Sequence, residues 1–194
     1  MWREDLKGAL SLPGITTTAG PMMVTLAGAK AGVDAFEDGA AAFKEIEAIK
    51  PNVVKNYQTG SEMINLFSTG EITTSVTQDF TLAQLKEAIP TITWAELSDG
   101  DIAVLNTVNI PKGSENVDLA HEFINFILDP AVQKTLAEAG VDAPTSKLVE
   151  LSPEAAAKWT YGEEKINSLK QIDYTKLNAA KLQWVDQWNE IFGM

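Results

Sequence analysis

The sequence predicts an α/β fold, with a mixed sheet flanked by helices, and three observations support it. Short runs rich in β-branched residues alternate with amphipathic helical segments along the first half of the chain. Proline, glycine and capping residues separate these segments, so the connections between them are short. The 194 residues are 45% hydrophobic, which is enough to form a folded core. Strands and helices that alternate through short connections are typical of a layered α/β domain.

Residues 1–95 carry most of this alternation. We expect helices at residues 24–32, 38–49, 61–67 and 82–88, and strands just before residue 14 and at residues 53–57, 72–76 and 91–95. The second helix has the clearest pattern, because Asp38 is placed to cap its start and Pro51 to end it. The proposed strands are short and rich in Val, Ile and Thr, as strands usually are.

Beyond residue 100 the pattern changes to one long strand followed by helices. The strand is expected at residues 102–110, and the helices at 117–128, 130–139, from Ser152 onward and at 175–192. The only histidine, His121, falls on the polar face of the first of these helices, which favours a surface residue over a catalytic one. Trp184 and Trp188 are spaced four apart on the last helix, which is typical of core packing.

Composition excludes several classes of function. The chain has 15 basic and 27 acidic residues, and its net charge of −12 opposes binding to nucleic acid or to an anionic membrane surface. It contains no cysteine and one histidine, so we expect no cofactor, no metal and no thiol or Ser–His–Asp catalysis. No apolar run approaches the roughly 20 residues that a membrane span needs, so no membrane insertion is predicted.

One turn and one strand end are candidate binding positions. Thr16, Thr17 and Thr18 lie in a turn that follows a strand and leads into a helix. Free backbone N–H groups at such a place favour a small polar or anionic group, although one threonine capping the helix explains the pattern equally simply. Asp79 follows another predicted strand, and ligands of α/β sheets bind at strand ends.

Several motifs along the chain carry a resemblance to a known family. Residues 106–116 read NTVNIPKGSEN and residues 120–130 read AHEFINFILDP; IKPNV at 49–53, TGEI at 69–72 and DAPT at 142–145 accompany them. This series resembles the extracellular solute-binding proteins of bacterial ABC importers, specifically the spermidine/putrescine-binding-like group. The resemblance covers essentially the whole chain, but only the later part of a family member.

The resemblance implies a type II periplasmic-binding-protein-like architecture, in which two lobes hold a solute between them. It implies that residues 1–103 belong to the second lobe, that 104–143 are an excursion into the first lobe, and that 144–194 return to the second. It also implies non-covalent binding of a small solute, an ABC permease as partner, and a periplasmic or extracellular location, associated with the membrane through the transporter.

The resemblance also supplies candidate ligand-binding positions. The loop that carries acids in polyamine binders corresponds to Thr16, Thr17 and Thr18, an aromatic position to Gln78 beside Asp79, an acid to Asn106, and a polar position to Asp173 or Tyr174. Most of the acidic and aromatic set is therefore replaced. This replacement predicts a neutral polar or anionic solute rather than a polyamine.

Two other classes of function remain as alternatives. A ligand-sensing effector domain of a transcriptional regulator shares the two-lobed design, but it normally comes with a basic helix-turn-helix that this acidic chain does not show. An enzyme is disfavoured, because no nucleophile–base pair can be assembled.

Residues 104–143 carry apolar side chains intended for the absent lobe, which predicts a homodimer through this segment. They are Phe123, Ile124, Ile127 and Leu136.

Overall fold

The computed structural model describes residues 1–95, 97, 101–157, 159 and 162–193. The chain divides into two compact units, each considered by itself below. Unit 1 consists of Met1–Ile102 and Lys170–Met194, and unit 2 consists of Ala103–Leu169. The predicted excursion, residues 104–143, lies inside unit 2, which continues to Leu169. The assignment of the two units to the two implied lobes stays a prediction.

Unit 1 is built on a small parallel sheet. Its strands are β1 (Leu10–Pro13), β2 (Val53–Tyr57) and β3 (Thr74–Ser75), in the order β2-β1-β3. All four residues of the central strand β1 are buried. Helices connect β1 to β2 and β2 to β3, and such crossovers place neighbouring strands parallel. The described part of the sheet is therefore parallel, where the sequence predicted a mixed sheet.

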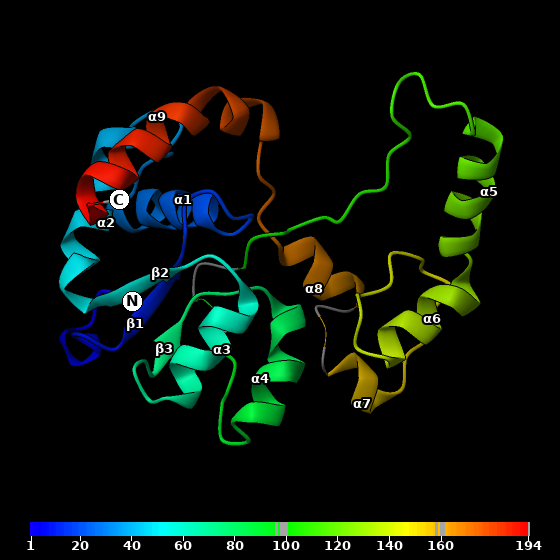
Figure 1. The fold of residues 1–194 in the computed structure, drawn as a ribbon, viewed down its shortest axis with the longest axis horizontal. Helices are drawn as coiled ribbons and strands as arrows, with labels where there is room; N and C mark the ends of the chain where they lie inside the picture. The colour runs from blue at the N-terminus through cyan, green and yellow to red at the C-terminus, as the bar shows by residue number, and fades with distance from the viewer. Residues whose placement is uncertain (96, 98–100, 158, 160–161, 194) are drawn as a thin grey trace. The chain divides into compact units, whose positions relative to one another are not determined.

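Helices cover both faces of this sheet (Figure 1). On one side lie α1 (Gly20–Ala31), α2 (Gly39–Ile49) and α9 (Tyr174–Phe192). On the other lie α3 (Gly60–Ser68) and α4 (Leu82–Ala88). Three short 3-10 helices complete the unit: η1 (Glu4–Leu6), η2 (Lys50–Asn52) and η3 (Asp79–Thr81).

The main core of unit 1 joins segments from both ends of the chain. Leu10 and Leu12 of β1 pack in one cluster with buried residues of α1, α2 and α9. Trp184 and Trp188 of α9 are 3% and 0% exposed, which confirms their predicted role in packing. The Trp184 ring stacks on Phe36 with centroids 5.1 Å apart. α9, from the end of the chain, is thus part of the same core as β1.

Most predicted elements of unit 1 are present with small changes in their bounds. Asp38 caps α2 by accepting a hydrogen bond from the Ala41 N–H at 3.0 Å, as predicted. α1 begins at Gly20, four residues earlier than expected, because Pro21 can occupy the first turn of a helix. β3 is shorter than the predicted strand at 72–76. The strand predicted at residues 91–95 is wrong, since these residues join no sheet in the described structure.

Unit 2 contains helices but no sheet among its described residues. The helices are α5 (Val117–Ile127), α6 (Pro130–Glu138), α7 (Pro153–Ala156) and α8 (Glu163–Ser168). The long strand predicted at residues 102–110 is wrong, because only Ile102 pairs, in a single bridge to Lys170 of unit 1. A strand needs a neighbour to pair its N–H and C=O groups, and residues 103–110 have none in the described structure.

A buried glutamine organises the end of α6 and the segment that follows. Gln133 is 7% exposed, and its Oε1 accepts hydrogen bonds from the Thr145 and Ser146 N–H groups at 2.9 and 3.0 Å. Its Nε2 donates to the Leu128 carbonyl oxygen at 3.3 Å. Trp159 Nε1 donates to the Ala137 carbonyl oxygen at 2.9 Å. These contacts attach Thr145, Ser146 and Trp159 to α6.

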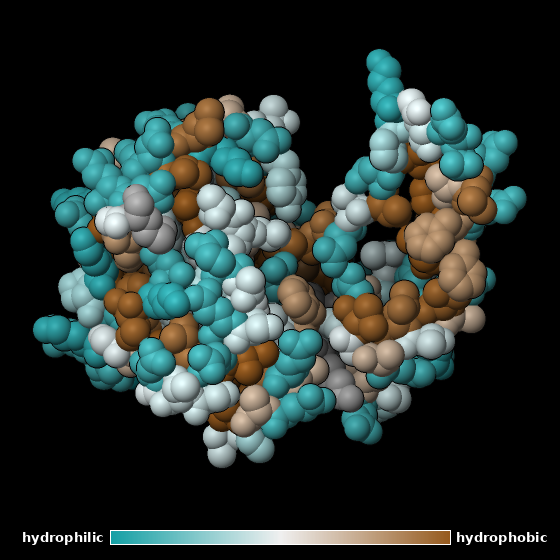
Figure 2. Space-filling view, in the orientation of Figure 1, coloured by the Kyte–Doolittle hydropathy of each residue, from teal (hydrophilic) through white to brown (hydrophobic). Residues whose placement is uncertain are grey.

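One face of α5 exposes large apolar side chains. Leu119, Phe123 and Phe126 are 65%, 56% and 60% exposed, and hydrophobic residues gather over the α5–α6 region in Figure 2. The sequence predicted exposed apolar side chains at Phe123, Ile124, Ile127 and Leu136. Phe123 is exposed, whereas the other three residues are half-buried. None of the helices in the described ranges is both long and apolar enough to span a bilayer.

Candidate functional site

The carboxyl ends of the three parallel strands meet at one edge of the unit 1 sheet. Residues 14–18 follow β1, Gln58 follows β2, and Gln78 and Asp79 come shortly after β3. Open α/β sheets bind their ligands outside this edge. The arrangement brings Thr16, Thr17, Thr18, Gln78 and Asp79 to the same edge of the sheet.

The threonines of the turn after β1 have different roles. Thr17 Oγ1 donates to the Gly14 carbonyl oxygen at 2.8 Å and accepts from the Gly20 N–H at 3.1 Å. Thr17 therefore holds the turn and the first N–H of α1, whereas the N-cap residue of the helix is Ala19, which makes no side-chain cap bond. Thr16 and Thr18 are exposed, so their hydroxyls remain accessible to a ligand.

The sequence did not indicate Gln58, which belongs to this edge. Thr16 Oγ1 lies 3.3 Å from Gln58 Oε1 and donates to it. The Gln58 amide also lies directly over Gly14, where a Cβ atom would collide with it. The sequence offered one signal for Gln58, its position directly after a predicted strand. Its contact with Thr16 could not be predicted, because the two residues lie 42 positions apart in the chain.

The backbone at Gln58 is fixed by the start of α3. The Gln58 N–H donates to Glu62 Oε2 at 2.8 Å, and the Glu62 N–H donates to Thr59 Oγ1 at 3.2 Å. Glu62 also forms an ion pair with Lys55. The Gln58 N–H and the Lys55 ammonium lower the pKa of Glu62 below its usual range. This exchange of bonds resembles a capping box and holds Gln58 at the sheet edge.

Tyr57 joins two of the strand ends. Its hydroxyl donates to the Val76 carbonyl oxygen at 2.7 Å, so the end of β2 is tied to the segment after β3. The side chain is 6% exposed. Burial raises the pKa of Tyr57, because the ionised phenolate is disfavoured away from water.

Gln78 and Asp79 lie where the chain turns into η3. Both residues are half-buried, and Gln78 is the residue that precedes η3. The Gln78 carbonyl oxygen accepts from Thr81 Oγ1 at 2.7 Å, and Thr81 Oγ1 lies 3.1 Å from Thr77 Oγ1. The backbone of this segment is therefore anchored while the Gln78 side chain makes no hydrogen bond within the described residues.

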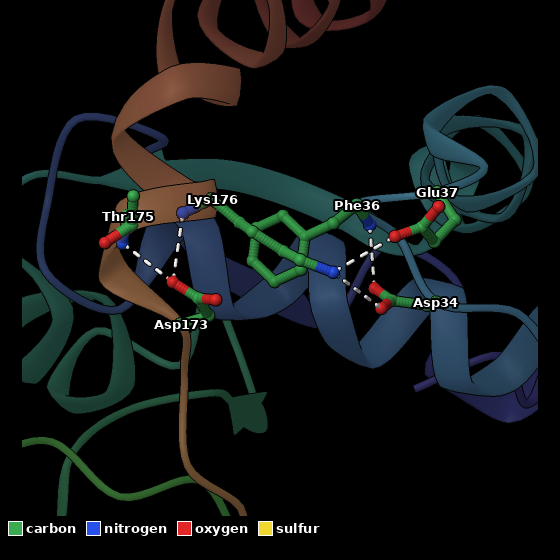
Figure 3. A network of polar contacts seen from close by, with 6 residues as sticks. All are labelled: Asp34, Phe36, Glu37, Asp173, Thr175 and Lys176. Carbon is green, nitrogen blue, oxygen red and sulfur yellow. Dashed lines mark hydrogen bonds and ion pairs between the residues drawn. The ribbon is translucent and has the colours of Figure 1, made fainter.

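Asp173 and Tyr174 lie at the start of α9, on unit 1. Asp173 Oδ1 accepts from the Thr175 and Lys176 N–H groups at 2.9 and 3.1 Å, so this carboxylate caps the helix (Figure 3). Tyr174 is 44% exposed. In the described structure no hydrogen bond connects either residue to the turn at residues 14–18.

Asn106 lies on unit 2, in the extended segment that was expected to be a strand. Its Nδ2 donates to Asp142 Oδ2 at 2.7 Å, and Asp142 Oδ1 accepts from the Ala143 N–H at 2.9 Å. Asp142 is a residue that sequence reasoning missed, since the contact spans 36 positions. The pair presents hydrogen-bond acceptors, the Asn106 amide oxygen and the Asp142 carboxylate.

The chemistry of these positions is that of hydrogen bonding. The sheet edge offers hydroxyl and amide groups from Thr16, Thr18, Gln58 and Gln78, together with the carboxyl group of Asp79. The sole histidine, His121, is exposed on α5. Within the described ranges, no group of three or more His, Cys, Asp or Glu residues could hold a metal ion. Such a set suits reversible binding of a polar molecule.

A family model for bacterial extracellular solute-binding proteins matches residues 2–163. The chain belongs to this family. A spermidine/putrescine-binding periplasmic protein from Escherichia coli (strain K12) is 26% identical over 159 residues. The crystal structure of an ABC transporter protein from Clostridium perfringens ATCC 13124 superposes with a TM-score of 0.86 at 44% identity. A ferric binding protein from Campylobacter jejuni shares the fold, with a TM-score of 0.67 at 19% identity.

The chain matches only part of each of these proteins. The match to the Escherichia coli protein covers 80% of this chain and 45% of that protein. The Clostridium perfringens match covers 98% of this chain and 60% of the other, and the Campylobacter jejuni match covers 98% and 60%. The chain therefore spans about half the length of the curated relatives it matches.

The family membership confirms three predictions from the sequence. The chain has the α/β fold of periplasmic binding proteins, it belongs to the solute-binding proteins of ABC transporters, and that family consists of binding proteins rather than enzymes. The alternative of a regulator's effector domain is not favoured by these matches. The family is extracellular or periplasmic, as the resemblance implied.

Proposed function

We propose that this chain is the part of an ABC-importer binding protein that holds a small polar solute at the carboxyl edge of the unit 1 sheet. The whole protein would deliver that solute to a membrane permease from the periplasmic or extracellular side. The family match over residues 2–163 carries this proposal. The fold supports it, since the edge that binds ligands in open α/β sheets is also where the candidate side chains gather.

The side chains at this edge favour a solute that hydrogen-bonds without carrying strong positive charge. Thr16, Thr18, Gln58 and Gln78 are neutral and can both donate and accept. The Escherichia coli relative is named for spermidine and putrescine. Polyamine recognition needs several carboxylates, and this edge offers Asp79 alone among the candidate residues. We therefore propose a neutral polar or anionic solute.

Asn106 and Asp142 add a second, acceptor-rich position on unit 2. One Nδ2 hydrogen of Asn106 is donated to Asp142, and the amide oxygen of Asn106 can accept hydrogen bonds. Acceptors select for hydroxyl or amino groups on a ligand.

A binding screen with one variant at the sheet edge tests this proposal. The chain would be screened by thermal shift against sugars and polyols, amino acids, dicarboxylates, spermidine and putrescine, and each hit would be titrated by calorimetry. Gln78→Ala should weaken binding of a true hit about tenfold, the loss typical of one or two hydrogen bonds. Its stability should change by about 0.5 kcal/mol or less, because its side chain makes no described hydrogen bond.

A control variant and three possible outcomes of the screen complete this test of the solute site. Lys44→Ala, on the surface of α2, should leave the affinity unchanged. If every hit kept its affinity in Gln78→Ala, the solute site would lie elsewhere. Micromolar binding of spermidine or putrescine would contradict the proposed solute class, and a screen without any hit would contradict binding by this chain on its own.

A further inference from the structure

Unit 1 contains a pocket away from the sheet edge. It has a volume of about 280 Å³ and lies between the second half of α1, the loop after that helix, and the segment leading into α9. Leu26, Val33, Phe36 and Ile172 give it an apolar lining. The volume is close to the lower end of the roughly 300–1,000 Å³ range of small-molecule sites, which suits a ligand smaller than a typical drug.

Charged groups of both signs line the same pocket. Lys170 is exposed, and its ammonium forms no ion pair in the described structure. Asp173 uses Oδ1 to cap α9, which leaves Oδ2 without a hydrogen-bond donor among the described residues. One free cation and one free carboxylate oxygen therefore border an apolar interior. An isolated anion or an isolated cation would satisfy only one of them.

A network of polar contacts, called the strap below, joins Lys176 of α9 to Asp34 and Glu37 in the loop after α1 (Figure 3). Lys176 Nζ of α9 donates to Glu37 Oε1 at 3.0 Å and lies 3.8 Å from Asp34 Oδ2. It also lies 6.0 Å from the centroid of the Phe36 ring. Asp34 in turn accepts from the Phe36 N–H at 2.9 Å. Lys176 and Asp34 are thus occupied with each other, and the loop after α1 is fixed against α9.

We propose that this pocket binds a small zwitterion with an apolar side chain, about the size of leucine. The carboxylate would pair with the Lys170 ammonium and the amino group with Asp173 Oδ2. The side chain would lie among Leu26, Val33 and Ile172, where its burial is favourable. Because the strap fixes the walls in advance, little ordering would be needed on binding. This proposal is independent of the solute site at the sheet edge.

The pocket also borders both places where the chain crosses between units. Ile102 and Lys170 line it, and they form the single bridge at which the chain leaves unit 1 and returns. The Lys170 N–H donates to the Asp101 carbonyl oxygen at 2.9 Å. A bound zwitterion held by Lys170 would therefore restrain these crossing residues, and the Lys170 amide would exchange its hydrogen more slowly.

Titration with leucine and two truncated analogues tests the proposal on the 194-residue chain. L-leucine should shift the NMR signals of α1 and of residues 170–173 and should slow exchange of the Lys170 amide. 3-Methylbutylamine, which lacks the carboxylate, and 4-methylpentanoate, which lacks the amino group, should each bind at least about tenfold more weakly, because each loses one charged hydrogen bond. Lys170→Met should reduce leucine binding to the level of the amine.

A pocket-filling variant and two controls complete the test. Ala29→Trp adds a large side chain at an exposed position of α1 that lines the pocket, and it should abolish leucine binding without unfolding the chain. Lys44→Met, at an exposed position of α2 that does not line the pocket, should have no effect. The proposal is overturned if leucine does not bind, if either analogue binds as well, or if Ala29→Trp binds normally. Loss of leucine binding in Gln78→Ala instead would place leucine at the sheet edge and also overturn it.

Discussion

At the scale of single residues, the hydroxyl of Tyr57 connects two strand ends that line the candidate site. It is buried, and it donates to the Val76 carbonyl oxygen at 2.7 Å. Removing the hydroxyl leaves that carbonyl only the longer, 3.5 Å bond from Ser75 Oγ, and we expect Tyr57→Phe to lower the free energy of unfolding by about 1 kcal/mol. Urea denaturation of both proteins at neutral pH measures this difference.

The same residue makes part of the stability depend on alkaline pH. Burial raises the pKa of Tyr57 in the folded state above its value in the unfolded chain, near 10. The fold therefore favours the neutral phenol, and its contribution to stability is complete below about pH 10 and falls as the pH rises through the folded-state pKa. Tyr57→Phe should lose less stability than the parent between about pH 8 and pH 11. An equal loss in both proteins would contradict this origin.

Gly20 must be glycine because the backbone of Gly14 lies very close to it. A Cβ atom at this position would lie against the Gly14 carbonyl oxygen, well inside van der Waals contact. We expect Gly20→Ala to destabilise the chain by about 2 kcal/mol and to displace the threonine turn at residues 14–18, because backbone atoms must move. Thermal unfolding and the NMR shifts of residues 14–18 would report both effects.

Gly39→Ala serves as the matched control for Gly20. Its added Cβ would find the Trp184 Nε1 atom at 3.7 Å, an ordinary contact. We expect this variant to be at least as stable as the parent, since alanine restricts the unfolded chain at a helical position. Similar losses in both glycine variants would refute the close-approach argument.

At the scale of elements, Gln133 connects α6 to the segment that follows it. Gln133→Met keeps the size of the side chain but removes the acceptor for the N–H groups of Thr145 and Ser146. We expect a loss of about 2 kcal/mol and faster hydrogen exchange confined to residues 141–149. Lys134→Met, on an exposed neighbouring position, should change neither quantity.

Helices could be predicted from the sequence because their signals are local. Three helices begin at residues that mark a helix start in the sequence, and the structure has all three starts. They are Asp38, Asp129–Pro130 and Ser152–Pro153. Strands at 91–95 and 102–110 were wrong because β-branched composition does not provide a pairing partner. The partner of a strand is decided by chain elsewhere in the molecule.

The residues of the candidate site also differ in whether a local signal in the sequence indicates them. Thr16, Thr18, Gln78 and Asp79 could be placed at the sheet edge because each follows a strand that the sequence indicated. Gln58 and Asp142 could not, because their contacts with Thr16 and Asn106 span 42 and 36 residues. Asp173 was assigned a role in binding, whereas one of its oxygens caps α9, a use that the first turn of the helix would have suggested.

At the scale of the whole molecule, the exposed side chains of α5 predict association. Leu119, Phe123 and Phe126 form one apolar face, and no charged residue occurs between Ile102 and Pro111. Two copies can therefore approach through this region despite a net charge of −12. We expect the chain to be a homodimer through residues 104–143, and light scattering to give about twice the 21.0 kDa of one chain.

A charge on the apolar face should separate the copies. Phe126→Asp should give the monomer mass without loss of helical content, because the Phe126 side chain is already 60% exposed. Lys44→Asp, on α2 and outside residues 104–143, should leave the dimer intact. A mass near 21 kDa for the parent chain at micromolar concentration would rule out this association.

Because unit 2 interrupts unit 1, the order of synthesis on the ribosome has a consequence for folding. Leu10 and Leu12 leave the ribosome more than 170 residues before Trp184 and Trp188, which complete their cluster. Residues 103–169 are finished before that, so unit 2 can fold while the first strand still lacks its last covering helix. A nascent chain thus keeps an open apolar layer until α9 has been made. Such a chain depends on chaperones during this interval more than one whose units are contiguous.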